Sequence, residues 1–369
     1  MPQINGLVTS VSILKRGLEE KNNDVYIVAP SVPGFKKKDE KIINVPSIPF
    51  IFLPEYRNAT FFSLKLFNLI SKIKFDVIHT HTPFFLGILG MYMGKIFHIP
   101  LVHTYHTYFE EYLHYVKLPS NIGISIVKYF SQWYCNKMDS IIVPSYFMSK
   151  ILRRYNIKND INIIPTGIDI KEFQKVDYNK INIWKDKLKL KRDDNILLYV
   201  GRLAKEKNLY FLIDIFSKLS KIYKNIKLLM IGDGPEHKHL KHYAIEKKVD
   251  SLVIFTGYIK RDEIKYIYHL SNIFVFPSLT ETQGLVLLEA MATGLPIVSF
   301  YKRGTTAVLP DEKIEGISSV LDENSFFKEI IFYLEYKNKE KIKKNLKEYV
   351  KKFDYQVMTD NILNIYKKV

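Results

Sequence analysis

Two glutamates have the residue type and the spacing to bind one ligand at two points. Glu281 and Glu289 lie eight positions apart, in a stretch that passes from an apolar run through a turn-rich segment into an expected helix. With a rise of about 1.5 Å per residue, this separation is roughly two helical turns, so the carboxylates suit the two ends of an elongated ligand. Gly284 permits a close backbone approach beside them, and the N-terminus of the following helix favours an anion.

Two cations and a glycine-containing loop predict a phosphate site in the second half of the chain. Arg202 and Lys207 follow an apolar run at 196–200 and precede a helical pattern. A strand that ends in glycine and cations before a helix suits phosphate groups, although two ordinary surface cations would give the same pattern. Gly232 lies in the loop after the next expected strand. The dinucleotide fingerprint G-x-G-x-x-G does not occur in the sequence.

The arrangement E-x7-E followed by A-M-A-x-G-x-P resembles the signature of retaining glycosyltransferases of family 4, which have the GT-B fold. The sequence P-T-G-I-D at 165–169 is similar to the interdomain junction of that family. The resemblance implies an α/β protein with two Rossmann-like domains, whose parallel sheets face each other across a cleft. It also implies transfer of a sugar with retention of the anomeric configuration, by a front-face or an internal-return path.

The resemblance further implies roles for individual residues. Glu281 would hold hydroxyls of the donor sugar and Glu289 the ribose hydroxyls, while the two cations would neutralise the departing diphosphate without a metal ion. Gly6 matches the glycine of a loop that presents backbone amides to the donor phosphates. The expected catalytic residues are His106 and Glu281, and the expected cofactor-binding residues are Gly6, Arg202, Lys207, Gly232, Gly284, Leu285 and Glu289.

The segment 76–115 is rich in histidine and aromatic residues, and it places four histidines at the C-terminal ends of two expected strands: His79, His81, His103 and His106. Histidines at the carboxyl ends of parallel strands lie where open α/β sheets bind ligands. A zinc site is an alternative, but no acidic or cysteine ligand recurs at a fitting spacing. The run H-T-Y-H-T with E-E-Y resembles bacterial diacylglycerol glycosyltransferases. That likeness implies that His106 contacts the donor sugar and that Glu110 or Glu111 lies near the acceptor.

The expected reaction therefore moves glucose or galactose from a UDP-sugar to the free 3-hydroxyl of 1,2-diacylglycerol, giving a membrane glycolipid. A family 4 enzyme acting on another lipid-linked or polysaccharide acceptor is the first alternative. A nucleotide-sugar epimerase of the same shape and a non-catalytic basic binding protein are the other two. The epimerase would lack the E-x7-E unit, and a binding protein would have no need of the cations and glutamates together.

The net charge of +17, from 55 Lys and Arg against 38 Asp and Glu, favours anionic partners. Nucleic acid, nucleotide and anionic lipid all qualify, and compositional drift toward lysine would give the same excess. We expect an anionic membrane surface and diacylglycerol rather than nucleic acid. The helix expected at 61–75 either packs on the sheet or lies at that surface, because it combines apolar and aromatic residues with lysines.

Alternating strands and helices predict parallel sheets in two domains, with a boundary near residue 172. The first domain, 1–172, would bind acceptor and membrane and include the C-terminal helix 354–369, and the second, 173–353, would bind the nucleotide-sugar. Met1 falls inside the loop that follows the family's opening strand, so we expect the native start to lie upstream. The single cysteine, Cys135, excludes an intrachain disulfide. The sequence contains no run of about twenty apolar residues, so we expect no membrane-spanning segment. We expect a cytoplasmic protein, peripheral on the inner face of the cell membrane.

Overall fold

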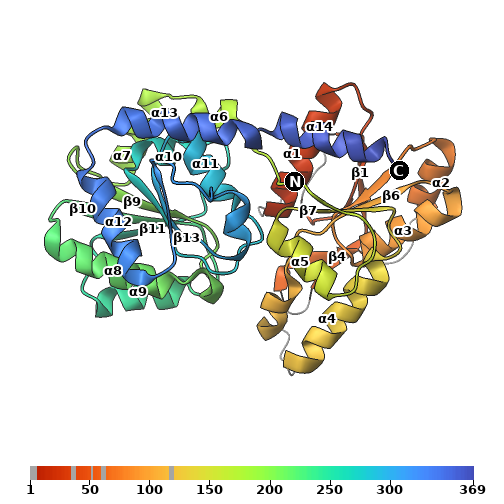
Figure 1. Ribbon diagram of the computed structural model, residues 1–369, viewed down its shortest axis with the longest axis horizontal. Coiled ribbons are helices and arrows are strands. Elements are labelled where there is room, and N and C mark those ends of the chain that lie inside the picture. The colour runs from red at the N-terminus through yellow and green to blue at the C-terminus, as the bar shows by residue number, and fades with distance from the viewer. Residues whose placement is uncertain (1–5, 35–38, 51–52, 60–63, 116–119) are drawn as a thin grey trace. The chain divides into compact units, whose positions relative to one another are not determined.

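The computed structural model describes residues 6–34, 39–50, 53–59, 64–115 and 120–369 (Figure 1). The chain forms two compact units, one of Met1–Gly167 with Tyr355–Val369 and the other of Ile168–Asp354. The first break lies between Gly167 and Ile168, slightly before the boundary expected near residue 172.

The sheet of the C-terminal unit contains six parallel strands in the order β11-β10-β9-β12-β13-β14. Counted along the unit, this is the Rossmann order 3-2-1-4-5-6. The strands are near-continuous apolar runs because helices cover both faces of the sheet. They are β9 (Asn195–Val200), β10 (Ile226–Ile231), β11 (Val253–Gly257), β12 (Ile273–Phe276), β13 (Ile297–Phe300) and β14 (Ile317–Val320).

Two groups of helices cover this sheet, as Figure 1 shows. Phe211 of α8 packs edge-on against Phe326 of α12, so these two helices share one face. That group is α8 (Leu209–Ile222), α9 (His237–Glu246) and α12 (Glu323–Glu335). The other group, whose members contact one another, is α6 (Ile170–Gln174), α7 (Tyr178–Lys187), α10 (Ile264–Leu270), α11 (Leu285–Thr293) and α13 (Lys339–Tyr349).

The strand order reverses between β9 and β12, which lie side by side although 72 residues separate Val200 from Ile273. The chain leaves the two strands toward opposite edges of the sheet, so the loops after them diverge and leave room for a ligand. The segment after β9 contains the short helix η2 (Lys205–Lys207), and the segment after β12 leads into α11. The expected phosphate cations and both glutamates therefore belong to the segments that start at this point.

The N-terminal unit contains four parallel strands in the order β5-β6-β7-β8, and a separate parallel pair, β1-β2. Within the described residues no strand joins these two sheets, and residues 1–5, where the opening loop is expected, lie outside that part of the chain. The strands are β1 (Ile27–Pro30), β2 (Ile42–Val45), β5 (Ile78–Thr80), β6 (Leu101–Thr104), β7 (Ser140–Val143) and β8 (Ile161–Ile163).

An antiparallel hairpin, β3 (Ser47–Phe50) and β4 (Leu53–Ala59), departs from the parallel alternation that the sequence predicts. The segment contains Pro49 and Pro54, which lack a backbone N–H and are therefore tolerated in a hairpin at the edge of a fold rather than in a central strand. The expected helix at 61–75 is α2, Leu64–Lys72.

The C-terminal helix α14 (Tyr355–Tyr366) belongs to the N-terminal unit and packs on α1 (Gly6–Glu20). The Tyr355 hydroxyl donates a hydrogen bond to Glu20 Oε2 at 2.6 Å. The helices approach so closely at Gly17 that an added Cβ would lie 2.1 Å from the Thr359 hydroxyl oxygen. The unit's remaining helices are α3 (Phe85–Phe97), η1 (Phe109–Tyr115), α4 (Ser120–Cys135) and α5 (Tyr146–Arg154).

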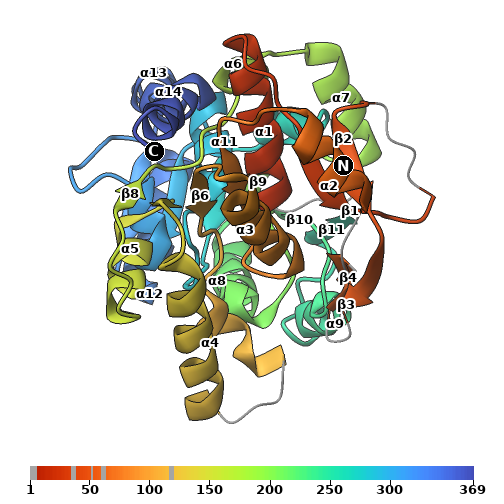
Figure 2. The ribbon, with the colours of Figure 1, turned by 90° about the vertical axis from the view of Figure 1, so that its right-hand side faces the viewer.

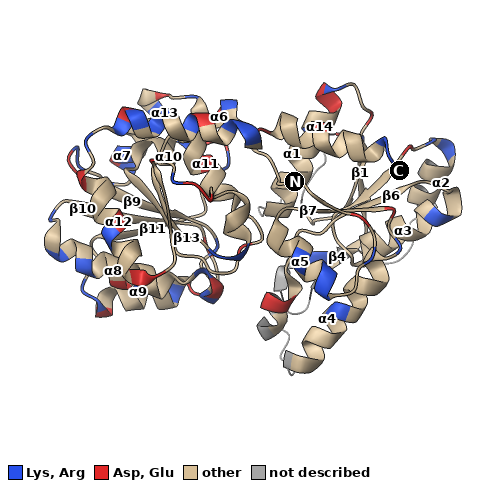
Figure 3. Cartoon of the chain, in the orientation of Figure 1, with Lys and Arg blue, Asp and Glu red and all other residues tan. Residues whose placement is uncertain are grey.

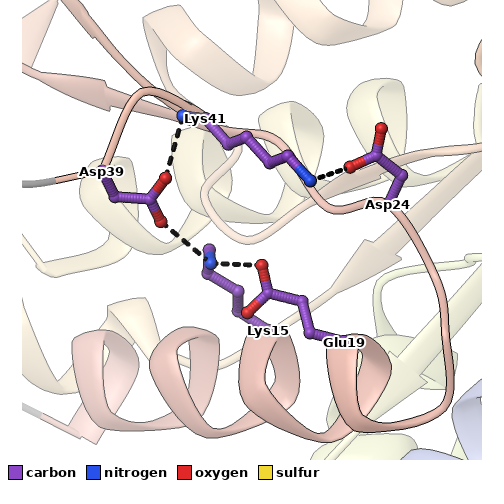
Figure 4. A network of polar contacts seen from close by, with 5 residues as sticks. All are labelled: Lys15, Glu19, Asp24, Asp39 and Lys41. Carbon is purple, nitrogen blue, oxygen red and sulfur yellow. Dashed lines mark hydrogen bonds and ion pairs between the residues drawn. The ribbon is translucent and has the colours of Figure 1, made fainter.

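Charged side chains join α1 to the segment that precedes β2 (Figure 4). Lys15 Nζ lies 2.5 Å from Glu19 Oε1 and 3.0 Å from Asp39 Oδ2. The backbone N–H of Lys41 donates to Asp39 Oδ1 at 2.9 Å, and the Lys41 ammonium pairs with Asp24. The hydrogen bond from Lys15 is the main cause of a lowered Asp39 pKa. This network fixes the orientation of α1, the helix that begins at Gly6.

Candidate active site

A lysine–glutamate ion pair joins the segments that follow β9 and β12. Lys207 Nζ lies 2.6 Å from Glu281 Oε1, and both side chains are largely withdrawn from solvent. The Thr280 hydroxyl donates to the Glu206 carbonyl at 3.3 Å, which is a second link between the two segments. The structure thus brings together two residues that the sequence assigns to the diphosphate and to the sugar. A cation and a carboxylate held side by side can meet a phosphate and a hydroxyl of one ligand.

Glycines allow the neighbouring loops to approach at backbone distance. The N–H of Gly201 donates to the Ile231 carbonyl at 3.0 Å, and the N–H of Leu203 donates to the Asp233 carbonyl at 3.0 Å. Gly232 has φ +129°, and a Cβ added there would lie 2.0 Å from the Gly201 carbonyl oxygen. Only glycine fits this position, so Gly232 shapes the loop beside Arg202 rather than supplying a side chain.

The helix expected after the turn-rich segment begins where the sequence predicts. Gly284 adopts a left-handed conformation with φ +89°, and α11 starts at Leu285. The backbone N–H of Gly304 donates to the Glu281 carbonyl at 2.9 Å, which fixes the loop ahead of the helix. The N-terminal N–H groups of α11 thus lie in the same segment as Glu281, as an anion site at a helix start requires.

Glu289 lies in the buried interior of the same unit and already has two protein partners. The Tyr268 hydroxyl donates to Glu289 Oε2 at 2.8 Å, and Arg261 Nη1 lies 2.5 Å from Oε1. Arg261 and Glu289 thus form an ion pair, and Oε1 accepts no hydrogen bond from the described residues. Burial, followed by the charge of Glu289, raises the pKa of Tyr268 well above its usual value. The sequence did not single out Arg261 or Tyr268, although Arg261 lies in the loop after β11, at the sheet edge where ligands bind, and Tyr268 lies on α10, which follows that loop.

In the N-terminal unit two histidines pair across the ends of β5 and β6. His81 Nδ1 lies 2.9 Å from His106 Nε2, and the two rings are stacked with centroids 5.2 Å apart. One nitrogen of the pair donates and the other accepts, so at least one ring has a defined tautomer. Burial lowers the pKa of His106 to about 4. The expected catalytic histidine is therefore neutral near pH 7 and held in place by a second imidazole.

The histidines on the strands themselves, His79 on β5 and His103 on β6, belong to a buried hydrogen-bond network. His79 bridges Tyr366 of α14, at 2.6 Å, and the Thr104 hydroxyl, at 2.7 Å. His103 Nδ1 lies 2.9 Å from the Thr80 hydroxyl oxygen, and burial lowers the pKa of His103 to about 3. In the described part of the chain, no cluster of three or more His, Cys, Asp or Glu side chains is arranged to hold a metal ion.

Glu110 accepts hydrogen bonds from two tyrosines of its own unit. The Tyr108 hydroxyl donates to Oε2 at 2.7 Å, and Tyr155 donates to Oε1. Both carboxylate oxygens thus have protein partners, and Glu110 supports η1 beside the histidine pair. Gly6, assigned by resemblance to the donor phosphates, is the first residue of α1. No helix in the described residues is long and apolar enough to cross a membrane.

Comparison with known proteins identifies the family. Residues 4–172 match the family described as Glycosyltransferase Family 4, and residues 180–353 match Glycosyl transferases group 1. An alpha-monoglucosyldiacylglycerol synthase of Streptococcus pneumoniae is 33% identical, over 81% of this chain and 68% of its own. The synthase of that name from Acholeplasma laidlawii is also 33% identical, over 85% of this chain and 81% of its own.

A solved structure supports the same assignment at the level of the fold. HepE of Anabaena, in complex with UDP and glucose, superimposes with a TM-score of 0.77 and 16% sequence identity, over 100% of this chain and 98% of that one. The Rossmann order of the C-terminal sheet and the E-x7-E segment at its switch point agree with these matches. The chain therefore belongs to glycosyltransferase family 4 and has the GT-B fold.

Proposed function

We propose that the protein transfers glucose or galactose from a UDP-sugar to the 3-hydroxyl of 1,2-diacylglycerol, with retention, at the inner face of the cell membrane. The observation that carries the proposal is the Lys207–Glu281 pair at the switch point of a Rossmann sheet, 2.6 Å between charged atoms. The names of two relatives, both alpha-monoglucosyldiacylglycerol synthases, support the acceptor. The complex of HepE with UDP and glucose supports the donor.

The residues of the C-terminal unit would act on the donor. When the bond between the anomeric carbon and the diphosphate breaks, its electron pair leaves with UDP, and negative charge grows on the phosphate oxygens. Lys207, Arg202 and the N-terminus of α11 would stabilise that charge. Glu281 would accept hydrogen bonds from sugar hydroxyls. Glu289 Oε1, which lacks an aligned donor among the described residues, has capacity to accept one from the ribose.

The N-terminal unit would act on the sugar and the acceptor. His106, neutral and fixed by His81, would hold a hexose hydroxyl. The acceptor oxygen would bond to the anomeric carbon, and its proton would pass to an oxygen of the departing diphosphate. This balance holds for a front-face displacement, and an internal return within the ion pair gives the same products.

The test is transfer of radiolabelled glucose or galactose from the UDP-sugar to dioleoylglycerol in phosphatidylglycerol-containing vesicles, with free UDP measured in parallel. Labelled glycolipid with the anomeric configuration of the donor is the expected product. Lys207→Met should lower kcat/KM by about 10²- to 10³-fold, the range for losing one charge-stabilising group. Lys205→Met is the matched control, because Lys205 is exposed in the same turn, and it should change the rate by less than about twofold.

Each outcome decides a different part of the proposal. UDP release without labelled glycolipid would refute the diacylglycerol acceptor and would favour another lipid-linked or polysaccharide acceptor. Absence of UDP release with both donors would refute the UDP-hexose assignment. Equal rates for the Lys207 and Lys205 variants would refute the role given to the ion pair.

A further inference from the structure

Helix α4 presents a row of apolar side chains to solvent. Ile122, Ile126 and Tyr129 follow one another at helical spacing and therefore lie on one side of the helix. Their exposed fractions are 50%, 53% and 72%. The helix packs through a different side, which includes Gly123 against Leu113 of η1. Figures 1 and 2 show that α4 extends from the sheet of its unit toward the lower end of the view. An exposed apolar row of this length on a helix marks an interaction site.

Two phenylalanines at the start of α3 are also exposed, and one of them lies beside α4. Phe84 and Phe85 are each 46% exposed. The Phe84 ring lies 6.4 Å from that of Phe130, which follows Tyr129 on α4. We call the five exposed residues the α4 surface: Phe84, Phe85, Ile122, Ile126 and Tyr129.

The helices α3, α4 and α5 contain cations and no acids, whereas η1, which packs on α4, contains Glu110 and Glu111. No Asp or Glu occurs in α3, α4 or α5, and Figure 3 shows no red on α4. On α5, Tyr146 is 62% exposed and the Lys150 ammonium lies 4.6 Å above its ring. Aromatic and aliphatic side chains bordered by cations are typical of surfaces that bind anionic lipid headgroups. The Lys and Arg residues of the three helices are Lys95, Lys128, Lys150, Arg153 and Arg154.

The α4 surface is continuous with the histidine pair. Phe84 follows His81 by three residues, and Phe109 follows His106 by three residues. The two phenylalanine rings contact each other edge-to-face, with centroids 5.4 Å apart. Both loops that hold the paired imidazoles therefore lead directly into apolar rings. A lipid whose hydroxyl lay near the histidines could place its acyl chains along these rings, and Glu110, which follows Phe109, is held by Tyr108 and Tyr155.

From these observations we infer that the α4 surface rests on an anionic bilayer, with its apolar side chains among the acyl chains and the cations at the lipid phosphates. This inference rests on the proposed function, because an acceptor that lies in a bilayer requires the enzyme to bind there. It assigns the membrane contact to α4 and the start of α3, whereas the sequence had suggested the helix at 61–75. The alternative occupant is a soluble protein whose acidic side chains pair with the five cations, and the test below distinguishes it from a bilayer.

The test is flotation of the purified full chain with vesicles of phosphatidylcholine alone or with phosphatidylglycerol added. The double variant Ile126→Ser/Tyr129→Ser should bind anionic vesicles at least about tenfold more weakly than the parent, because two apolar side chains no longer enter the lipid. The control is Ile222→Ser/Ile245→Ser, which removes two isoleucines of the C-terminal unit that are 56% and 58% exposed. It should bind as the parent does, and circular dichroism checks that both variants fold.

The outcomes separate this proposal from the proposed function. Weaker vesicle binding by the α4 variant alone supports the surface, even if no donor yields glycolipid. The α4 proposal is overturned if that variant binds anionic vesicles as the parent does, or if the parent itself does not bind them. A third variant, Lys72→Glu on α2, tests the other helix, and the proposal is also overturned if this is the only change that weakens vesicle binding. It is also overturned if the α4 variant changes only the oligomeric state, because the surface would then cover a second copy. Retained transfer to dioctanoylglycerol in detergent micelles would show that the α4 variant has an intact active site.

Discussion

Replacing Glu289 by glutamine should destabilise the C-terminal unit, because this carboxylate is 1% exposed and has two partners. The amide keeps the size of the side chain but has one oxygen only. If that oxygen accepts from Tyr268, the NH2 group faces Arg261, and two donors then oppose each other. The unmet donor costs about 1 to 2 kcal/mol. The lost ion pair adds about 1 kcal/mol, since the Arg261 side chain is 44% exposed and solvent screens it.

The total of roughly 2 to 3 kcal/mol corresponds to a fall in Tm of about 4 to 12 °C for a unit of this size. The assay is urea unfolding followed by tryptophan fluorescence. The chain has two tryptophans, so a Trp133→Phe background leaves Trp184, which is buried in the C-terminal unit, as the reporter. Glu340→Gln serves as the control, because Glu340 is 87% exposed and lies 3.9 Å from Lys343.

A double-mutant cycle with Tyr268→Phe tests whether the two side chains act together. The phenylalanine leaves Glu289 Oε2 without its donor, and in the double variant the glutamine oxygen, no longer held by Tyr268, is free to turn toward Arg261 and remove the contact between two donors. The double variant should therefore cost at least about 1 kcal/mol less than the sum of the single ones. A Glu289→Gln variant that unfolds within about 0.5 kcal/mol of the parent, or strictly additive costs, would refute the assignment of a buried network.

Two further predictions concern the loop glycines and the histidines. Gly232→Ala should lower the unfolding free energy and weaken UDP binding in calorimetry, because its Cβ would lie 2.0 Å from the Gly201 carbonyl oxygen. The control is Gly257→Ala, also at positive φ but with nothing within 4 Å of an added Cβ, and it should cost only about 1 to 2 kcal/mol of unfolding free energy. Equal costs for the two variants would contradict the clash at Gly232. Burial lowers the pKa of His103 to about 3 and that of His106 to about 4, so the unfolded chain binds protons that the folded chain does not as pH falls below about 6.5. Below that pH, each of these histidines should lower the unfolding free energy of the N-terminal unit by about 1.4 kcal/mol for each unit by which the pH falls. Urea midpoints of this unit that stay constant from pH 7 to pH 5 would contradict the prediction.

Local patterns predicted the elements of the C-terminal site but not their partners. The turn-rich segment ending at Gly284 and the apolar spacing after it correctly placed the start of α11. The contact between Lys207 and Glu281 joins residues 74 positions apart, and it depends on which strand pairs with β9. A family resemblance suggested that both residues face the donor, but the pattern of either segment alone could not show that they touch.

The N-terminal unit was harder to predict because its strands are short and its contacts are distant in sequence. β5 has three residues and β8 has three, too few for a clear alternation of apolar and polar positions. The hairpin β3-β4 was missed because parallel alternation was expected throughout. The contact of His79 with Tyr366 spans 287 positions and exists only because α14 returns to the first unit.

The different surroundings of Glu281 and Glu289 give a physical reason for the fixed spacing between them. Glu281 precedes α11 and pairs with Lys207, whereas Glu289 lies on α11 and accepts from Tyr268 of α10. A residue inserted within α11 ahead of Glu289 would turn its carboxylate by about 100° around the helix axis and leave a buried charge without its donor. A residue inserted before Gly284 would displace Glu281 and spare the buried network. The separation of the two carboxylates is therefore set by where α11 begins, and the left-handed glycine at that point determines both positions.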